Sequence, residues 1–220
     1  MSLDLLRQKL PEVESWVEHT VVAHAAQARR VASFGFARLG DYYPASLLHA
    51  AKVVAVPTVP VPPLTELGLP GFEEFEQLDA AGITYLDTYF VCADRVRDES
   101  LHFHELVHVN QWIHLGPRNF ILAYALGHKI SGGYRTNPFE VTAYDLQARF
   151  EAGEPAFDAA AIARAHARCS ALPSTLTASS RVGTTGFLCS LSAAFRPRMR
   201  VSASCRRAGV ITPSATPCCM

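Results

Sequence analysis

The chain has 220 residues, 49 % of them apolar, and its 20 basic residues balance 20 acidic ones. This length and composition are enough for one globular domain with a sizeable core. Because there is no net charge, composition gives no electrostatic basis for binding nucleic acid or an anionic membrane, and we expect neither as a partner.

The first nine residues alternate apolar and charged side chains, unlike the unbroken apolar stretch of a secretory signal. The longest apolar runs, such as residues 120–126, are too short to cross a bilayer. Cys92 is the single cysteine of the first 168 residues, whereas a disulfide framework would need several cysteines within the folded domain. We therefore expect a reduced, cytoplasmic protein.

In the first third of the chain, apolar positions recur at helical spacing over residues 13–39, and Gly40 ends the run. Ser46 is expected to cap a short helix that reaches residue 51. Residues 53–59 are β-branched and predict a strand. Pro57 and the prolines that follow predict an edge position or an early stop for that strand.

Residues 83–91 are rich in aromatic and β-branched side chains and form the clearest predicted strand. Three helical stretches follow, at about residues 99–115, 118–130 and 138–152. Glycines and prolines separate them, and Pro138 suits a first helical turn. The elements predict an α+β domain with an N-terminal helix, a small sheet with an edge strand, and helices that carry the site.

The composition changes near the end of the chain. No Asp or Glu follows Asp158, and from residue 169 Ser, Thr, Ala, Pro and Cys dominate without a sustained period. Two interpretations stay open: a disordered extension, or a stretch read out of its natural frame. We predict a domain over residues 1–168 and a disordered or aberrant tail over residues 169–220.

The strongest motif is His104-Glu105-Leu106-Val107-His108, an HExxH sequence within the helix predicted at about residues 99–115. Two His four residues apart lie on one face of a helix, so both imidazoles can bind one ion. The intervening Glu105 can take a proton from a metal-bound water without being a ligand. Zinc lowers the pKa of such a water to roughly 7. The motif therefore predicts a zinc cofactor with His104 and His108 as ligands and Glu105 as catalytic base.

The third zinc ligand has two candidates. Glu140 follows Asn137-Pro138 at the start of a later helix, whereas His114 has the spacing of an extended three-histidine pattern. That pattern needs the helix to break near Gln111, usually at a glycine. In an unbroken helix His114 lies about 15 Å along the axis from His104 and cannot share the ion. We favour Glu140, and His114 remains the alternative.

The motif together with Glu140 resembles the gluzincin branch of zinc metallopeptidases, the thermolysin-like group. The resemblance implies a zincin-like fold that hydrolyses peptide bonds of a peptide or protein substrate. It also implies an edge strand over the active-site helix, along which the substrate lies as an added strand. Residues 83–91 are the candidate, with Thr84, Leu86 and Thr88 along the substrate. Members of the thermolysin-like group usually have an acidic residue four positions after the ligand Glu, where this chain has Tyr144.

Three side chains could stabilise the transition state by donating a hydrogen bond: Tyr134, Tyr144 and His128. The alternative to a peptidase is a zincin-like interaction module without catalysis. Glu105 argues against this alternative, because a structural zinc site needs no base and usually has four Cys or His ligands. The oligomeric state stays open.

Overall fold

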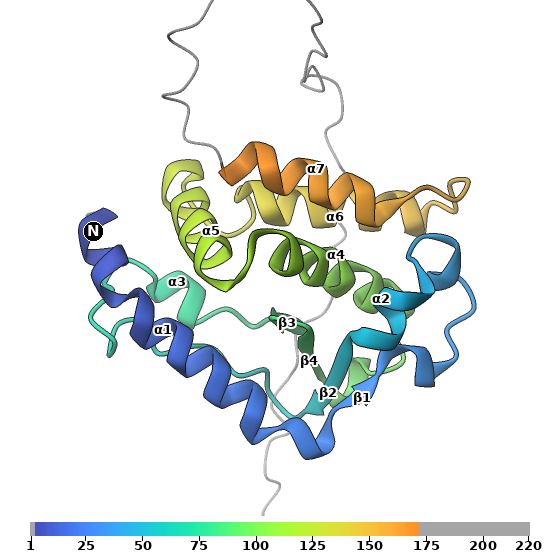
Figure 1. The fold of residues 1–220 in the computed structure, drawn as a ribbon, viewed down its shortest axis with the longest axis horizontal. Helices are drawn as coiled ribbons and strands as arrows, with labels where there is room; N and C mark the ends of the chain where they lie inside the picture. Colours follow the sequence, from blue (N-terminus) through green and yellow to red (C-terminus); the bar gives the residue numbers. More distant parts are fainter. Residues whose placement is uncertain (1–2, 172–220) are drawn as a thin grey trace, which may run out of the picture.

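The computed structural model describes residues 3–171. Within that part of the chain, seven α-helices and one four-stranded sheet form a mixed α+β fold, as expected from the sequence (Figure 1). None of the described helices combines the length and the apolar character that crossing a membrane requires. Most of the predicted tail, from residue 172 on, lies outside the described residues.

The N-terminal helix α1 (Leu3–Ala23) begins and ends earlier than the predicted 13–39. It buries Leu6, Leu10, Val13 and Val17, spaced four, three and four residues apart on one face. Beyond α1 lie three short 3-10 turns (Ala25–Gln27, Val31–Phe34, Leu39–Asp41) and the two-residue strand β1 (Arg29–Arg30). Val31, Phe34 and Leu39 are buried within these turns, so their helical spacing does not reflect one helix.

Helix α2 (Ala45–Ala50) leads into strand β2 (Lys52–Val56), which stops just before Pro57 as the sequence predicts. The sheet order is β1-β2-β4-β3, so β2 is an inner strand and not an edge. It pairs antiparallel with β1 and parallel with β4. A long connection that contains the short helix α3 (Glu73–Glu76) then leads to β3.

The single strand predicted over residues 83–91 is wrong, because this stretch forms a hairpin. Strand β3 (Gly82–Tyr85) pairs antiparallel with β4 (Thr88–Cys92), and β3 is the edge of the sheet. Leu86 takes a left-handed conformation in the two-residue turn, with φ at 58°. Such turns usually contain Gly, Asn or Asp at their left-handed positions. A leucine there gives no turn signal.

The three helices that follow the sheet match the sequence prediction closely: α4 (Glu99–Leu115), α5 (Pro117–Ser131) and α6 (Pro138–Glu151). The Asp98 carboxylate accepts hydrogen bonds from two backbone amides in the first turn of α4. The Asn137 side chain caps α6 by accepting from the backbone amide of Phe139. Pro138 occupies the first turn of α6, where its missing amide proton costs nothing.

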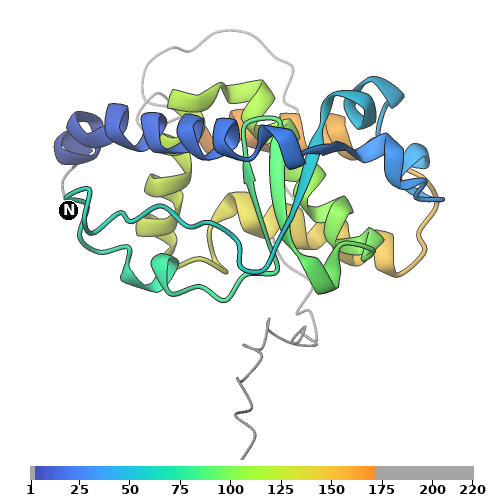
Figure 2. The same ribbon diagram turned by 90° about the horizontal axis from the view of Figure 1, so that it is seen from below.

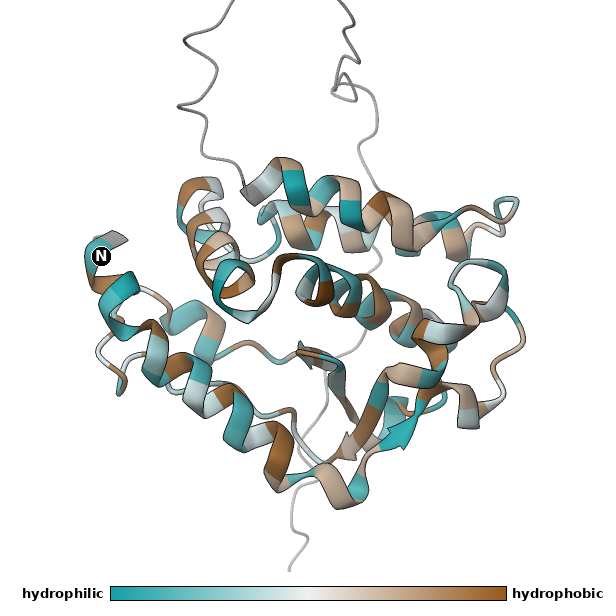
Figure 3. Ribbon diagram, in the orientation of Figure 1, coloured by the Kyte–Doolittle hydropathy of each residue, from teal (hydrophilic) through white to brown (hydrophobic). Residues whose placement is uncertain are grey.

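A seventh helix, α7 (Ala159–Ala171), was not predicted and crosses the expected boundary at residue 168. Its buried face includes Ala159, Ala163 and Ala167, one turn apart, and Ala160 beside them. Helix α4 lies between the sheet on one side and α6 and α7 on the other (Figure 1). Hydrophobic residues recur along α4 (Figure 3), and Leu106, Val107 and Val109 are all fully buried. Helix α1 runs across the sheet and reaches α5 (Figure 2).

Candidate metal centre

Three buried side chains converge between α4 and α6. His104 and His108 project from α4, and Glu140 projects from the first turn of α6. Their exposed fractions are 4 %, 6 % and 3 %, and one potential ligand atom from each lies within 4.8 Å of the others. This group could bind a metal ion.

The distances within the group fit one small tetrahedral ion. The two Nε2 atoms are 3.1 Å apart. His108 Nε2 lies 3.3 Å from Glu140 Oε1, and His104 Nε2 lies 3.5 Å from Glu140 Oε2. Two ligands on a tetrahedral ion with bonds of about 2.0–2.1 Å are separated by about 3.3 Å. Glu140 Oε2 is buried and has no hydrogen-bond partner among the described residues, which is the state expected of an oxygen that binds a cation.

Two glutamines fix the orientation of the imidazoles. His104 Nδ1 lies 3.0 Å from Gln147 Oε1, and His108 Nδ1 lies 2.8 Å from Gln111 Oε1. Each glutamine amide nitrogen donates elsewhere: Gln111 Nε2 to the Phe139 carbonyl, and Gln147 Nε2 to Ser100 Oγ. Both glutamine oxygens are therefore acceptors, and both imidazoles carry a proton on Nδ1. The two Nε2 atoms are left to face a shared point, where they could bind one ion.

The charges of the group are strongly coupled. Burial alone lowers the pKa of His108, but the Glu140 carboxylate, the charge of Glu105 and the hydrogen bond to Gln111 together outweigh burial and raise this pKa to about 9. Burial raises the pKa of Glu140, yet the neighbouring charge of His108 and the contacts with both imidazoles hold it well below its usual range. Glu140 is thus ionised, as a metal ligand must be.

Glu105 lies beside the metal group and outside it. Its side chain is 3 % exposed, and Thr84 Oγ1 donates a hydrogen bond of 2.7 Å to Oε2. Burial raises the pKa of Glu105, and the charges of His104 and His108 partly offset the effect. The edge strand approaches closely: a β-carbon at Gly82 would lie 2.9 Å from the carboxyl carbon of Glu105. Only glycine fits there without displacing the carboxylate.

Of the three predicted hydrogen-bond donors, two lie near the group. The ring of Tyr144 is 4.6 Å from the ring of His104, and Tyr134 is hydrogen-bonded to Tyr144. His128 packs instead against Phe72 with tilted rings, whose centroids are 5.4 Å apart, and belongs to neither the metal group nor the cavity beside it. The structure therefore does not bring His128 together with the other predicted site residues.

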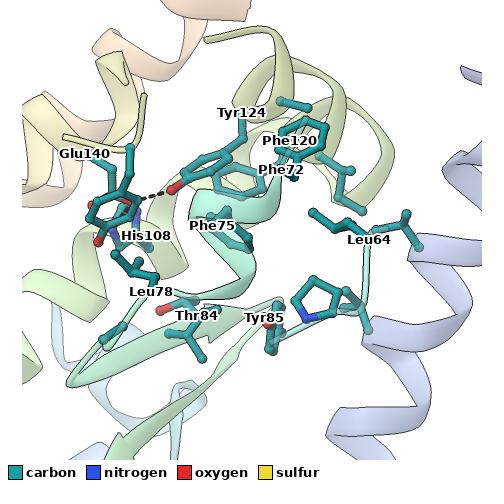
Figure 4. Close-up of a pocket in the computed structure, with 18 of the residues that line it drawn as sticks. Leu64, Phe72, Phe75, Leu78, Thr84, Tyr85, His108, Phe120, Tyr124 and Glu140 are labelled. Carbon is teal, nitrogen blue, oxygen red and sulfur yellow. Dashed lines mark hydrogen bonds and ion pairs between the residues drawn. The ribbon is translucent and has the colours of Figure 1, made fainter. Parts of the chain in front are cut away.

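Tyr124 on α5 is a donor that the sequence did not reveal. Its hydroxyl donates a hydrogen bond of 2.8 Å to Glu140 Oε1 (Figure 4). The ring packs against Phe120 and Phe139, which are both buried. Tyr124 thus orients the Glu140 carboxylate from a third helix.

The three residues predicted to lie along the substrate belong to three different parts of the hairpin. Thr84 lies on the edge strand β3, Leu86 lies in the hairpin turn, and Thr88 lies on the inner strand β4. A leucine in the turn and a threonine on an inner strand cannot pair with an added strand, so these two assignments are wrong. Thr84 alone keeps the expected position.

The alternative ligand His114 lies apart from the metal group. Helix α4 runs without a break through Gln111, and His114 is in its last turn. There His114 Nε2 accepts a hydrogen bond of 2.7 Å from Arg168 Nε of α7. The extended three-histidine arrangement therefore does not form.

The described residues thus bring together a buried group able to bind a metal ion, an adjacent carboxylate and the edge of a sheet. With a metal ion bound, such a group beside a separate carboxylate would have the parts that metal-assisted hydrolysis requires. No protein-family model, no curated protein and no solved structure matches the chain.

Proposed function

We propose that the protein is a zinc-dependent peptidase of the gluzincin type. One observation carries the proposal: Glu105 is buried next to the metal group but is not one of the three side chains that could bind the ion. A purely structural site has no use for a buried carboxylate in this position, because burying a charge is costly. A hydrolase needs a base there.

Zinc is the metal that best fits the ligands. Two imidazoles and one carboxylate leave a fourth tetrahedral position open, which distinguishes catalytic from structural zinc sites. When bound, zinc would polarise the scissile carbonyl and acidify water at this position. His104, His108 and Glu140 would hold the ion, and Gln147, Gln111 and Tyr124 would orient these ligands.

The side chains of the protein would move the proton and bind the polar groups. Glu105 would take a proton from the attacking water and pass it to the leaving amine. The Thr84 hydroxyl, which donates to Glu105 Oε2, would keep the carboxylate in place during both transfers. Tyr134, which lines the cavity beside the metal group, and Tyr144, whose ring lies 4.6 Å from that of His104, would donate hydrogen bonds to the developing oxyanion.

The edge strand β3 would bind the peptide backbone. The Cys92 amide donates a hydrogen bond to the Ala81 carbonyl. Hydrogen-bonded pairs recur every second residue in an antiparallel hairpin, so the next such pair is Ile83 with Phe90. Because antiparallel pairing alternates, the backbone groups of Gly82 and Thr84 face away from β4. The Thr84 carbonyl accepts from Trp112 Nε1. The amides of Gly82 and Thr84 and the carbonyl of Gly82 would bind an extended peptide.

The proposal is tested by digesting a mixed peptide library with the purified full chain, loaded with zinc, and analysing the products by mass spectrometry. Cleavage should stop when a chelator is added and return when zinc is restored. If the zinc-loaded protein cleaves no peptide in the library, the peptidase proposal fails and the non-catalytic interaction module is favoured.

A further inference from the structure

A row of polar side chains runs along the interface between α4 and α6. It consists of Ser100, His104 and His108 of α4, and of Glu140, Gln147 and Glu151 of α6. Within each helix the members are four or seven residues apart, so each set lies on one face. The contacts across the interface pair the two sets in reverse order, because Glu140 contacts His108, Gln147 contacts His104, and Glu151 contacts Ser100. The row therefore leads from the buried metal group to Glu151, which is exposed.

Gln147 connects the metal ligand to the outer end of this row. Its Oε1 lies 3.0 Å from His104 Nδ1. Its Nε2 donates to Ser100 Oγ at 2.9 Å and to Glu151 Oε1 at 3.0 Å. The single proton of the Ser100 hydroxyl is donated to Glu151 Oε1, so Ser100 Oγ can only accept from Gln147. Both groups at the outer end thus present acceptors to the glutamine amide.

The direction of the Gln147 amide decides which tautomer of His104 is stabilised. A glutamine amide has an oxygen acceptor on one side and an NH2 donor on the other, and either can face an imidazole nitrogen. When the oxygen faces His104, Nδ1 carries the proton and Nε2 keeps the lone pair that a metal ion needs. With the amide reversed, the NH2 group would donate to Nδ1, and the proton of the neutral ring would lie on Nε2. That tautomer cannot bind the ion through Nε2.

Glu151 is compatible with only one of these two directions. A carboxylate accepts hydrogen bonds and donates none, so the NH2 group of Gln147 can bind to Glu151 Oε1 and the amide oxygen cannot. Reversing the amide would place the oxygens of Gln147 and Glu151 against each other without a proton between them. The carboxylate at the surface therefore favours the direction that leaves His104 Nε2 free for a metal ion.

The second histidine is oriented by groups in the core. His108 Nδ1 lies 2.8 Å from Gln111 Oε1, and Gln111 Nε2 donates to the backbone carbonyl of Phe139. Gln111 is fully buried, and a backbone carbonyl cannot be altered by substitution. The contacts that orient His104, by contrast, end at an exposed side chain that can be exchanged without disturbing the core.

We infer that Glu151 is a positioning residue of the metal centre: from the protein surface, and through Gln147, it holds His104 in the tautomer that binds zinc. The inference rests on the zinc site of the proposed function and goes beyond it, because it concerns the preparation of a ligand before any ion or substrate arrives. It does not depend on hydrolysis.

The test exchanges the acceptor at position 151 and measures zinc affinity of the full chain by competition with a chromophoric chelator. In Glu151→Lys the ammonium group can bind the oxygen of Gln147 but not its NH2 group, so the amide should reverse. Zinc affinity should then fall by about 10-fold, the low end of the range for residues outside the ligand set. Glu154→Lys makes the same change of charge at another exposed position near the end of α6 and should bind zinc like the parent.

A matched pair separates hydrogen bonding from charge. Glu151→Gln and Glu151→Leu remove the same charge, but glutamine still offers an oxygen to Gln147 Nε2 and leucine does not. Zinc affinity should therefore be retained in Glu151→Gln and reduced in Glu151→Leu. Equal affinities of the parent, Glu151→Leu and Glu151→Lys would overturn the inference, and so would equal losses in Glu151→Gln and Glu151→Leu, because charge alone would then explain the effect.

The tautomer itself gives a second measurement on the metal-free proteins. Long-range 1H–15N correlation spectra show which ring nitrogen carries the proton, and His104→Gln assigns the signals of His104. The proton should be on Nδ1 in the parent and in Glu151→Gln, with a larger share on Nε2 in Glu151→Lys. An unchanged tautomer in Glu151→Lys would contradict the role of Glu151. If these results hold but the zinc-loaded parent cleaves no peptide, the proposed function fails and the inference stands.

Discussion

The Nε2 atoms of His104 and His108 lie 3.1 Å apart, and each ring holds its Nδ1 proton in a hydrogen bond to a glutamine oxygen. Two nitrogen lone pairs that face each other at this distance repel unless a cation lies between them. Without a metal ion a proton on His108 can take that place: burial lowers the pKa of His108, but the charges of Glu140 and Glu105 and the hydrogen bonds to Glu140 and Gln111 together raise it to about 9. A metal ion has to displace this proton.

Metal binding should therefore release protons over a defined pH range. At pH 7.5, which is below the raised pKa of about 9, His108 is protonated, and zinc binds the neutral imidazole, so about one proton per chain should be released from His108, in addition to any that a zinc-bound water releases. The release from His108 should fall off as the pH rises through 9. Calorimetric titration of zinc in two buffers of different ionisation enthalpy measures the number. No proton release at pH 7.5 would contradict the coupling between His108 and Glu140.

The third ligand can be identified from a matched pair of variants. Glu140→Ala should weaken zinc binding by more than the roughly 10- to 100-fold typical of residues that only orient a ligand. His114→Ala should leave the affinity unchanged, since His114 lies in the last turn of α4 and accepts a hydrogen bond from Arg168 of α7. Competition with a chromophoric chelator measures both affinities. Loss of zinc from His114→Ala with retention in Glu140→Ala would reverse the assignment.

Gln147 should contribute to zinc affinity although it is not a ligand. Its oxygen accepts the Nδ1 proton of His104 at 3.0 Å and so directs Nε2 towards the ion. Gln147→Leu should weaken zinc binding by roughly 10- to 100-fold, because leucine offers no acceptor to His104 Nδ1. Gln8→Leu, at an exposed position of α1, is the control. An unchanged affinity in Gln147→Leu would show that His104 is oriented by packing alone.

The sequence predicted the helices of the site well because their ends carry local signals. Asp98 and Asn137 cap α4 and α6, and Gly116 and Gly132 end α4 and α5. The hairpin was missed for the opposite reason: Leu86 adopts a conformation that leucine rarely takes, so the turn has no local signature. Helix α7 was missed because alanines form its buried face, and alanine gives a weak apolar period.

Within the site, the HExxH motif and Glu140 could be found from spacing, whereas their supporting contacts depend on packing between helices. Tyr124 meets Glu140 across two helices, and no spacing along the chain indicates that contact. The glutamines did leave a signal. Gln147 lies seven residues after Glu140 on α6, which is two helical turns, so both side chains lie on one face of the helix. That face could have been searched for partners of His104.

The role of Glu105 is tested most directly by Glu105→Gln, with zinc content and peptide hydrolysis measured on the same preparation. The amide keeps the shape of the side chain but cannot accept the proton of water, so hydrolysis should be lost while zinc stays bound at about one ion per chain. The Thr84 hydroxyl can still donate to the amide oxygen, so the fold around the site should persist. Hydrolysis at the parent rate by zinc-loaded Glu105→Gln would contradict the assignment of Glu105 as the base.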